Sequence, residues 1–152
     1  TLETEYMGKE ILCFRKVFST NSIAKFLANH SADEGTVLIS EIQTNARGRL
    51  GKKWEAPEGG IWMSLILRPQ VPPARIGLIT LATGVAIAKS IRSLGLDAKI
   101  KWPNDVLLTG GKVAGILLER TENKIIVGNF CCSFISFGSH YRCNTTEHNA
   151  KS

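Results

Sequence analysis

The sequence of 152 residues has few cysteines, and their placement excludes a disulfide-stapled scaffold. It holds four, of which three (Cys131, Cys132 and Cys143) lie near the C-terminal end, and no C-x-x-C pair is present. A zinc site would need those three with His140 and His148, in a spacing that structural zinc sites do not use. We therefore expect no metal site and a reducing, cytoplasmic compartment.

Long apolar runs are also missing. No segment reaches the roughly 18 uninterrupted apolar residues of a membrane span, because the most apolar stretch, 76–89, is broken by Thr80, Thr83 and Lys89. A charged start followed by an apolar core and a cleavage site, typical of a secretion signal, is not visible either. The sequence therefore predicts no contact with a membrane.

Positive charge is in excess. The formal net charge is +6 and the isoelectric point is near 9.3, which favours an anionic partner such as a nucleotide, a nucleic acid or an acidic protein surface. A basic surface that serves only solubility is the plain alternative. DNA binding is the weaker hypothesis, because no predicted helix carries a matching basic stripe.

Apolar and polar periodicity predicts strands and two helices. The expected helices start at Ser19–Ser22, with an apolar stripe of Ile23, Phe26 and Leu27, and at Pro72–Pro73. The second helix is expected to end before Gly95 and to bury Ile79, Thr83, Ala86, Ile87, Ser90, Ile91 and Leu94. Strands are expected at 12–18, 36–42, 61–67, 98–102, 112–120 and 124–128. Tight turns at Asn104–Asp105, Gly110–Gly111 and Glu122–Asn123 imply antiparallel neighbours, so we predict a mixed, largely antiparallel sheet packed with helices, in the α/β to α+β range.

The connection at 43–60 has an unusual composition. Four cations fall between Arg47 and Lys53, interleaved with Gly48 and Gly51, and Trp54 follows directly. Glycines let backbone N–H groups turn inward around an anion, and arginine adds bidentate donors. A flat tryptophan face suits a purine. The pattern indicates a loop that holds an anionic ligand, with a solvated basic turn as the alternative.

Four blocks in order resemble the biotin–protein ligases. They are S-T-N at 19–21, Q-T-x-x-R-G-R-L-G-x-K-W at 43–54, K-W-P-N-D at 101–105 and K-V-A-G-I-L-L-E at 112–119. The resemblance implies a class II aminoacyl-tRNA synthetase/biotin–lipoate ligase-like fold, here the truncated N-terminal part of a catalytic domain over residues 1–128. Residues 129–152 match nothing in the family and form a separate tail, whose order is left open.

The resemblance also implies a reaction. Biotin and ATP, with Mg²⁺, give biotinyl-5′-AMP, and the biotinyl group passes to a lysine of a biotin carboxyl carrier protein. Homodimerisation is left open. The DNA-binding segment of some relatives is not expected, since no helix-turn-helix precedes residue 10. A lipoate–protein ligase relative and a catalytically inactive biotin-binding fragment stay as alternatives.

The family's functional residues map onto the matching motifs. Arg47 and Lys112 are the implied catalytic residues. The implied biotin-binding residues are Ser19, Thr20, Asn21, Gln43, Arg47, Gly48, Arg49, Lys112 and Gly115. The implied ATP-binding residues are Arg47, Arg49, Trp54 and Lys112. Plainer roles remain open: helix capping for 19–21, a polar strand end for Gln43, a core or loop anchor for Trp54 and a surface lysine for Lys112.

Two positions stay ambiguous on sequence alone. Asp105 either helps to bind magnesium or orients a neighbour, and an Asx turn formed by Asn104 and Asp105 is the alternative. Ala46 stands where the family has the first glycine of G-R-G-R. If that position needs a positive φ, the alanine is strained, and it would also crowd biotin and weaken its binding.

Overall fold

A computed structural model describes residues 4–109, 111–121 and 124–131. Its strands are β1 (Ile11–Val17), β2 (Val37–Arg47), β3 (Lys53–Ala56), β4 (Ile61–Leu67), β5 (Lys99–Lys101), β6 (Asp105–Leu108), β7 (Gly111–Thr121) and β8 (Lys124–Cys131). Its helices are α1 (Thr20–His30) and α2 (Gly77–Arg92), with short 3-10 turns η1 (Arg49–Gly51) and η2 (Pro73–Arg75).

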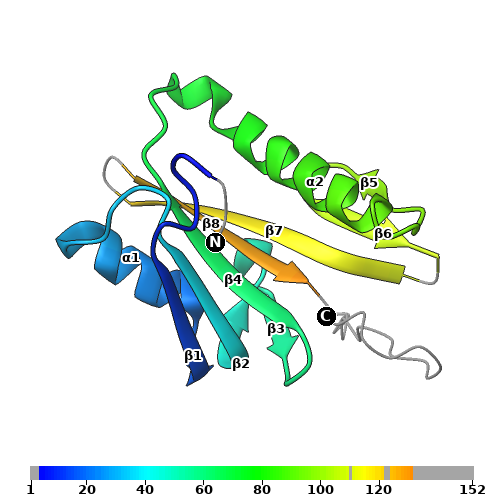
Figure 1. The fold of residues 1–152 in the computed structure, drawn as a ribbon, viewed down its shortest axis with the longest axis horizontal. Coiled ribbons are helices and arrows are strands. Elements are labelled where there is room, and N and C mark those ends of the chain that lie inside the picture. The colour runs from blue at the N-terminus through cyan, green and yellow to red at the C-terminus, as the bar shows by residue number, and fades with distance from the viewer. Residues whose placement is uncertain (1–3, 110, 122–123, 132–152) are drawn as a thin grey trace, which may run out of the picture.

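The strands form one curved sheet in the order β1-β2-β4-β8-β7-β6-β5, and β3 pairs with β2 outside this path (Figure 1). β1 and β2 are parallel and are joined by α1, whereas every other pairing in the described sheet is antiparallel. The predicted fold class is therefore confirmed. Two edges result, β1 and β5, and β8 lies inside the sheet between β4 and β7.

α1 begins where the sequence predicts. The Ser19 side chain caps the helix by accepting from the Ser22 N–H at 3.4 Å. Ala24 and Ala28, both fully buried, bring the helix close to the sheet. The expected apolar stripe is only partly right, because Phe26 is 61% exposed and stacks on His30, one turn along, instead of entering the core.

The two helices cover opposite faces of the sheet. On β8, Ile126 packs against the α1 cluster, whereas its neighbours Ile125 and Val127 pack against the α2 cluster. The buried face of α2 consists of Gly84, Ala88 and Ile91. The predicted face was partly wrong: Ile91 is buried, but Ala86, Ser90 and Leu94 are exposed. Small residues set this face because they allow a close approach to the sheet.

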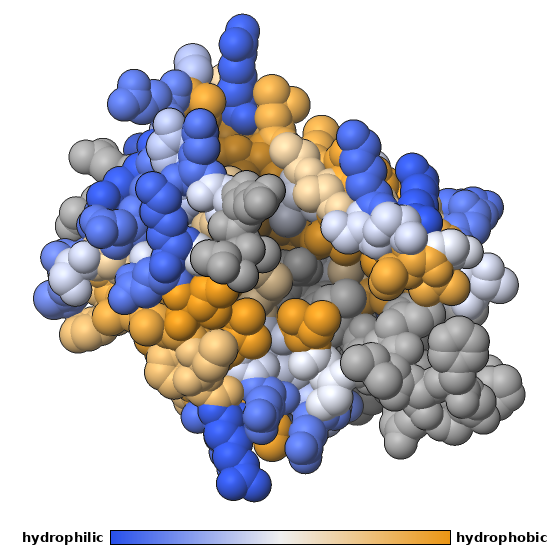
Figure 2. Space-filling model, viewed as in Figure 1, coloured by the Kyte–Doolittle hydropathy of each residue, from blue (hydrophilic) through white to orange (hydrophobic). Residues whose placement is uncertain are grey.

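The helical stretch Pro73–Arg92 is also, by its 20 residues and its composition, long and apolar enough to cross a membrane. A single helix of this kind is weak evidence, since core helices pass the same test. One face of α2 packs on the sheet, and Leu78 and Val85 on the other are exposed. Figure 2 shows such apolar side chains between polar ones on the side viewed in Figure 1.

The strand prediction missed two elements and shortened a third. The stretch 43–60 is not a single loop, because β2 continues to Arg47 and then pairs with β3. Strand β6 occupies 105–108 and was not expected. The turn predicted at Asn104–Asp105 covers residues 102–104 instead, and Asp105 is the first residue of β6. The predicted turns at Gly110–Gly111 and Glu122–Asn123 involve residues outside the described part of the chain, apart from Gly111.

One irregularity in β7 decides which way its side chains face. Val106 and Leu107 are consecutive on β6, but they pair with Ala114 and Lys112 on β7, which leaves Val113 as an extra residue. Val113 and Ala114 consequently both face the α2 core. The bulge places Lys112 on the other face, beside Gly115.

Candidate functional site: a polar cluster and a cationic cleft

A buried polar cluster lies at the N-terminus of α1. The Gln43 side-chain oxygen accepts from the Thr20 N–H at 2.8 Å and from the Thr20 hydroxyl at 3.0 Å. The Ser64 hydroxyl on β4 lies 2.8 Å from Thr20 Oγ1 and 2.5 Å from Asn21 Oδ1. All four residues are at most 5% exposed. The N-terminus of α1 and the interior parts of β2 and β4 therefore enclose a set of polar groups that an ordinary core would avoid.

The Nε2 group of Gln43 is buried and has no hydrogen-bond partner in the described part of the structure. A buried amide donor left in this way costs free energy unless a ligand or water satisfies it. Nearby, Gly128 approaches so closely that a Cβ there would lie 2.2 Å from Asn21 Oδ1. The cluster therefore offers a free donor and tightly placed acceptors.

Behind the cluster lies an ion pair between α1 and β7. Lys25 Nζ is 2.5 Å from Glu119 Oε1, and Asn21 Nδ2 donates to Glu119 Oε2 at 2.7 Å. Burial by itself raises the pKa of Glu119, but the hydrogen bonds from Lys25 and Asn21, with the charges of Lys25 and Arg47, outweigh it. The net effect is a pKa below the ordinary glutamate value.

This lowered pKa predicts a pH-dependent contribution to stability. A carboxyl whose pKa is lower in the folded than in the unfolded state, where it is about 4.3, stabilises the fold above that value. The contribution is lost as the pH falls through the folded-state pKa. We expect Glu119→Gln to lower the free energy of unfolding at pH 7, by an amount that shrinks towards pH 3 in urea titrations. Glu41→Gln, an exposed match on β2, should show no such trend, and a pH-independent deficit for Glu119→Gln would contradict the assignment.

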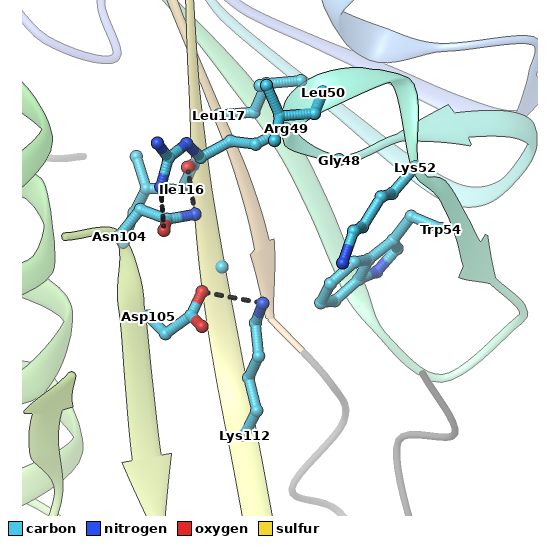
Figure 3. Close-up of a pocket in the computed structure, with 11 residues that line it drawn as sticks. Gly48, Arg49, Leu50, Lys52, Trp54, Asn104, Asp105, Lys112, Ile116 and Leu117 are labelled. Atoms are coloured by element: carbon cyan, nitrogen blue, oxygen red, sulfur yellow. Dashed lines mark hydrogen bonds and ion pairs between the residues drawn. The ribbon is translucent and has the colours of Figure 1, made fainter. Parts of the chain in front are cut away.

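A second feature, a cleft of about 240 Å³, opens on the same face of the sheet beyond β3. Its walls are the turn after β2, the start of β3, the start of β6 and the first half of β7. The lining residues are Gly48, Arg49, Leu50, Lys52, Trp54, Asn104, Asp105, Lys112, Gly115, Ile116 and Leu117. Figure 3 shows Lys112 and Asp105 on neighbouring strands, with Lys52 and Trp54 across the opening.

Lys112 is held in place at the centre of this cleft. Its Nζ is 2.7 Å from Asp105 Oδ1 and 4.5 Å from the centre of the Trp54 ring. A Cβ on Gly115 would lie 3.0 Å from Lys112 Cε, so the bare backbone of Gly115 is what lets the lysine cross β7. The alternative of a plain surface lysine does not describe Lys112, since its side chain is only 23% exposed and paired with Asp105.

The two arginines of the A-R-G-R motif point to different places. Arg49 lines the cleft and donates to Asn104 Oδ1 at 3.1 Å. Arg47 instead donates to Ser22 Oγ at 3.1 Å, at the start of α1. The structure therefore brings Arg49, Trp54, Lys112 and Gly115 together, and leaves Arg47 beside the polar cluster with Ser19–Asn21 and Gln43.

Asp105 orients a neighbour, namely Lys112, and Asn104 does not form an isolated turn. The side-chain amide of Asn104 donates to the Ile116 backbone carbonyl at 3.1 Å, and the backbone carbonyl of Asn104 accepts from the Ile116 N–H at 2.8 Å. These bonds tie the K-W-P-N-D segment to β7. Among the described residues, no group of three or more His, Cys, Asp or Glu side chains could hold a metal ion.

Sequence reasoning missed two residues that take part in the polar cluster and its ion pair. Ser64 lies inside a predicted strand, and a single serine among apolar residues gave the only signal. Glu119 ends the K-V-A-G-I-L-L-E block, but its partners Asn21 and Lys25 are more than 90 residues away in the chain. Such partners follow from the strand order, which the sequence does not contain.

The strain expected at Ala46 is absent. Leu50, at φ 58°, is the one non-glycine residue with positive φ in the described chain. Ala46 is a fully buried strand residue that packs with Ala56 and Trp62. We expect Ala46→Gly to destabilise the fold by about 1 kcal/mol, because it removes a buried methyl and loosens the strand. Urea unfolding measures this change, and a more stable Ala46→Gly would mean that the alanine is strained after all.

The fold and the two features define an α+β protein that places a cationic cleft beside a buried polar cluster. The chain belongs to the biotin/lipoate A/B protein ligase family, whose model matches residues 13–134. This match covers most of the chain and includes every element from α1 to β8. It extends to residue 134, beyond residue 128 where the motifs placed the end of the resemblance.

Individual relatives agree. The bifunctional ligase/repressor BirA of Bacillus subtilis is 43% identical over 120 residues, which are 78% of this chain and 37% of that protein. A biotin–[acetyl-CoA-carboxylase] ligase of Mycobacterium tuberculosis is 40% identical over 117 residues, covering 72% of this chain and 44% of the relative. The solved biotin protein ligase of Aquifex aeolicus, in complex with biotin and ATP, superposes with a TM-score of 0.73 at 32% identity, covering 81% of this chain and 52% of that one. The chain therefore spans about half the length of its relatives or less.

Proposed function

We propose that this chain is the N-terminal part of a biotin–protein ligase catalytic domain, over residues 1–128, acting in the cytoplasm. The enzyme would activate biotin with ATP to biotinyl-5′-AMP and transfer it to a lysine of a biotin carboxyl carrier protein. The observation that carries the proposal is Lys112, a cation held by Asp105 and Trp54 over the bare backbone of Gly115. A relative with bound biotin and ATP supports it.

The first step brings two anions together. A carboxylate oxygen of biotin attacks the α-phosphorus of ATP, the new P–O bond forms, and the bond to the leaving pyrophosphate breaks. The protein must chiefly supply positive charge and positioning. Lys112, Arg49 and Lys52 bring that charge to the cleft, and Trp54 offers a ring face for adenine.

The second step is acyl transfer. The neutral amine of the acceptor lysine attacks the biotinyl carbonyl carbon, and the C–O bond of the anhydride breaks as AMP leaves. The nitrogen releases one proton to solvent as the amide bond forms. Mg²⁺ would enter with ATP as part of the substrate, since it commonly uses one or two carboxylates with substrate phosphates. Asp105 is the one acidic residue among those lining the described cleft.

The ring end of biotin is assigned to the polar cluster. Thr20, Asn21, Ser64 and Gln43 supply hydroxyl and amide groups there, and the free Gln43 Nε2 is a donor for a ring carbonyl. Arg47, exposed at the end of β2, lies where it can close over the biotin chain with Gly48. A homodimer stays an open question in this proposal.

The test is biotin-dependent exchange of labelled pyrophosphate into ATP by the full chain. Exchange shows that the adenylation site is complete, and suppression by free biotin analogues but not by lipoate assigns the substrate. Biotin binding without exchange would replace the proposal by an inactive biotin-binding fragment. Neither binding nor exchange would overturn it.

A further inference from the structure

The Lys25–Glu119 ion pair lies outside the cationic cleft, and stability alone does not explain it. Its side chains are 32% and 21% exposed, so both charges have lost much of their water. Pairs of this kind regain in attraction about what they lose in desolvation. A better-attested use of such a pair is to fix one arrangement among several.

The arrangement that Glu119 fixes is the orientation of the Asn21 amide. An ionised carboxylate only accepts hydrogen bonds, so Asn21 must turn its NH₂ group towards it. The distance of 2.7 Å between Asn21 Nδ2 and Glu119 Oε2 agrees. The Asn21 oxygen is thereby turned towards Ser64, at 2.5 Å.

This orientation sets the direction of the neighbouring hydroxyl. The Ser64 hydroxyl lies 2.5 Å from Asn21 Oδ1 and 2.8 Å from Thr20 Oγ1. It has a single proton, and Asn21 Oδ1 can only accept, so Ser64 donates to Asn21 at the shorter distance and turns a lone pair towards Thr20. With the amide reversed, Asn21 would donate, and the Ser64 proton would turn towards Thr20 Oγ1, 2.8 Å away. Which groups of the cluster donate hydrogen bonds and which accept them therefore depends on Glu119.

On the other side of the cluster, the orientation of the Gln43 amide is also fixed. The Thr20 backbone N–H donates to the Gln43 oxygen at 2.8 Å, which leaves Nε2 as the free group. With Glu119 in place, the cluster presents one amide donor and hydroxyl acceptors. This pattern matches a ring with a C=O and an N–H side by side, such as the cyclic urea of biotin.

We propose that Glu119 is a positioning residue for biotin: held by Lys25, it fixes the Asn21 amide and through it the donor–acceptor pattern that the ring meets. The inference rests on the proposed function. It assigns a role in ligand binding to a carboxylate that does not contact the ligand.

The test uses Glu119→Gln, which keeps the shape and removes the charge. Lys25 is a cation and will bind the single oxygen of the glutamine side chain introduced at position 119. The NH₂ group of this glutamine will then face Asn21, and the Asn21 amide must reverse to accept from it. We expect the Kd for biotin, measured by titration calorimetry, to rise roughly tenfold. The KM for ATP at saturating biotin should stay within twofold, and Glu41→Gln should change neither.

A second variant separates positioning from simple damage. In the double variant Lys25→Met/Glu119→Gln, the glutamine oxygen is released and can turn to Asn21. We expect biotin affinity to return to within about threefold of the parent, although the ion pair is gone. A double variant as weak as Glu119→Gln, or an unchanged Glu119→Gln, would overturn the inference.

A readout without biotin keeps the two proposals apart. The side-chain NH₂ protons of Asn21 in ¹⁵N-edited NMR spectra should show NOE contacts to residue 119 in the parent and in the double variant, and to Ser64 in Glu119→Gln. If this pattern holds but the parent does not bind biotin, the proposed function fails and the positioning stands. If the Asn21 signals are alike in all variants, the positioning role is wrong.

Discussion

Replacing Lys112 by alanine should reduce biotin-dependent pyrophosphate exchange by about 100-fold or more. The loss of one fixed donor aimed at developing negative charge typically has an effect of this size. Lys112 is held in advance by Asp105 at 2.7 Å and by the Trp54 ring, so it does not have to be reorganised during the reaction. Initial-rate exchange at saturating ATP and biotin measures the effect.

Lys53→Ala is the matched control. Lys53 is exposed on β3, next to Trp54, and does not line the cleft. The Lys53→Ala substitution removes one positive charge from the same region. If it lowers exchange as much as Lys112→Ala does, general electrostatic attraction of the substrates, and not the placed cation of Lys112, accounts for the rate. Thermal unfolding should show Lys112→Ala to be less stable than Lys53→Ala, because it leaves the carboxylate of Asp105, whose side chain is only 19% exposed, without its partner. Exchange is therefore compared at a temperature at which both variants are folded.

Gly128→Ala should destabilise the chain by about 2–3 kcal/mol and abolish biotin binding. The added Cβ would lie 2.2 Å from Asn21 Oδ1 and 2.8 Å from Asn21 Cγ. Asn21 is itself buried, so it must give up its bonds to Ser64 and Glu119 to make room. Urea unfolding and biotin titration measure the two effects.

Gly84→Ala is the comparison for this variant. Gly84 lies within α2, where a Cβ would meet nothing closer than 3.8 Å. Alanine favours helix over glycine, so this substitution should stabilise the fold by up to about 1 kcal/mol. If both variants have the same stability as the parent, β8 and α1 are farther apart in solution than the structure places them.

The sequence predicted the elements with strong local signals. The cap at Ser19–Ser22 located α1, and runs of β-branched residues located β4 and β8. β3 and β6, each of 4 residues, were missed because they have no apolar period of their own and form by pairing with β2 and β7. Pairing partners are a property of the fold, not of a short segment.

The site was predictable to a similar extent. The motifs indicated the polar residues of α1, Gln43 and the cations of the cleft, and the structure brings Thr20, Asn21 and Gln43 together. The ion pair of Glu119, and the separation of Arg47 from Arg49, could not be predicted. Both depend on contacts between segments that are distant in the chain.

The single extra residue at Val113 decides which face of the sheet the Lys112 side chain lies on. In a regular strand, residues 112 and 115 would face opposite sides of the sheet. The bulge reverses the alternation once, so Lys112 joins Gly115 and Glu119 on the face of the cleft and the polar cluster, while Val113 and Ala114 stay in the core. A deletion of one residue here would keep the composition of β7 almost unchanged and turn its only lysine towards α2. In this chain, the number of residues in β7 therefore decides which side chains face the cleft, as much as their identity does.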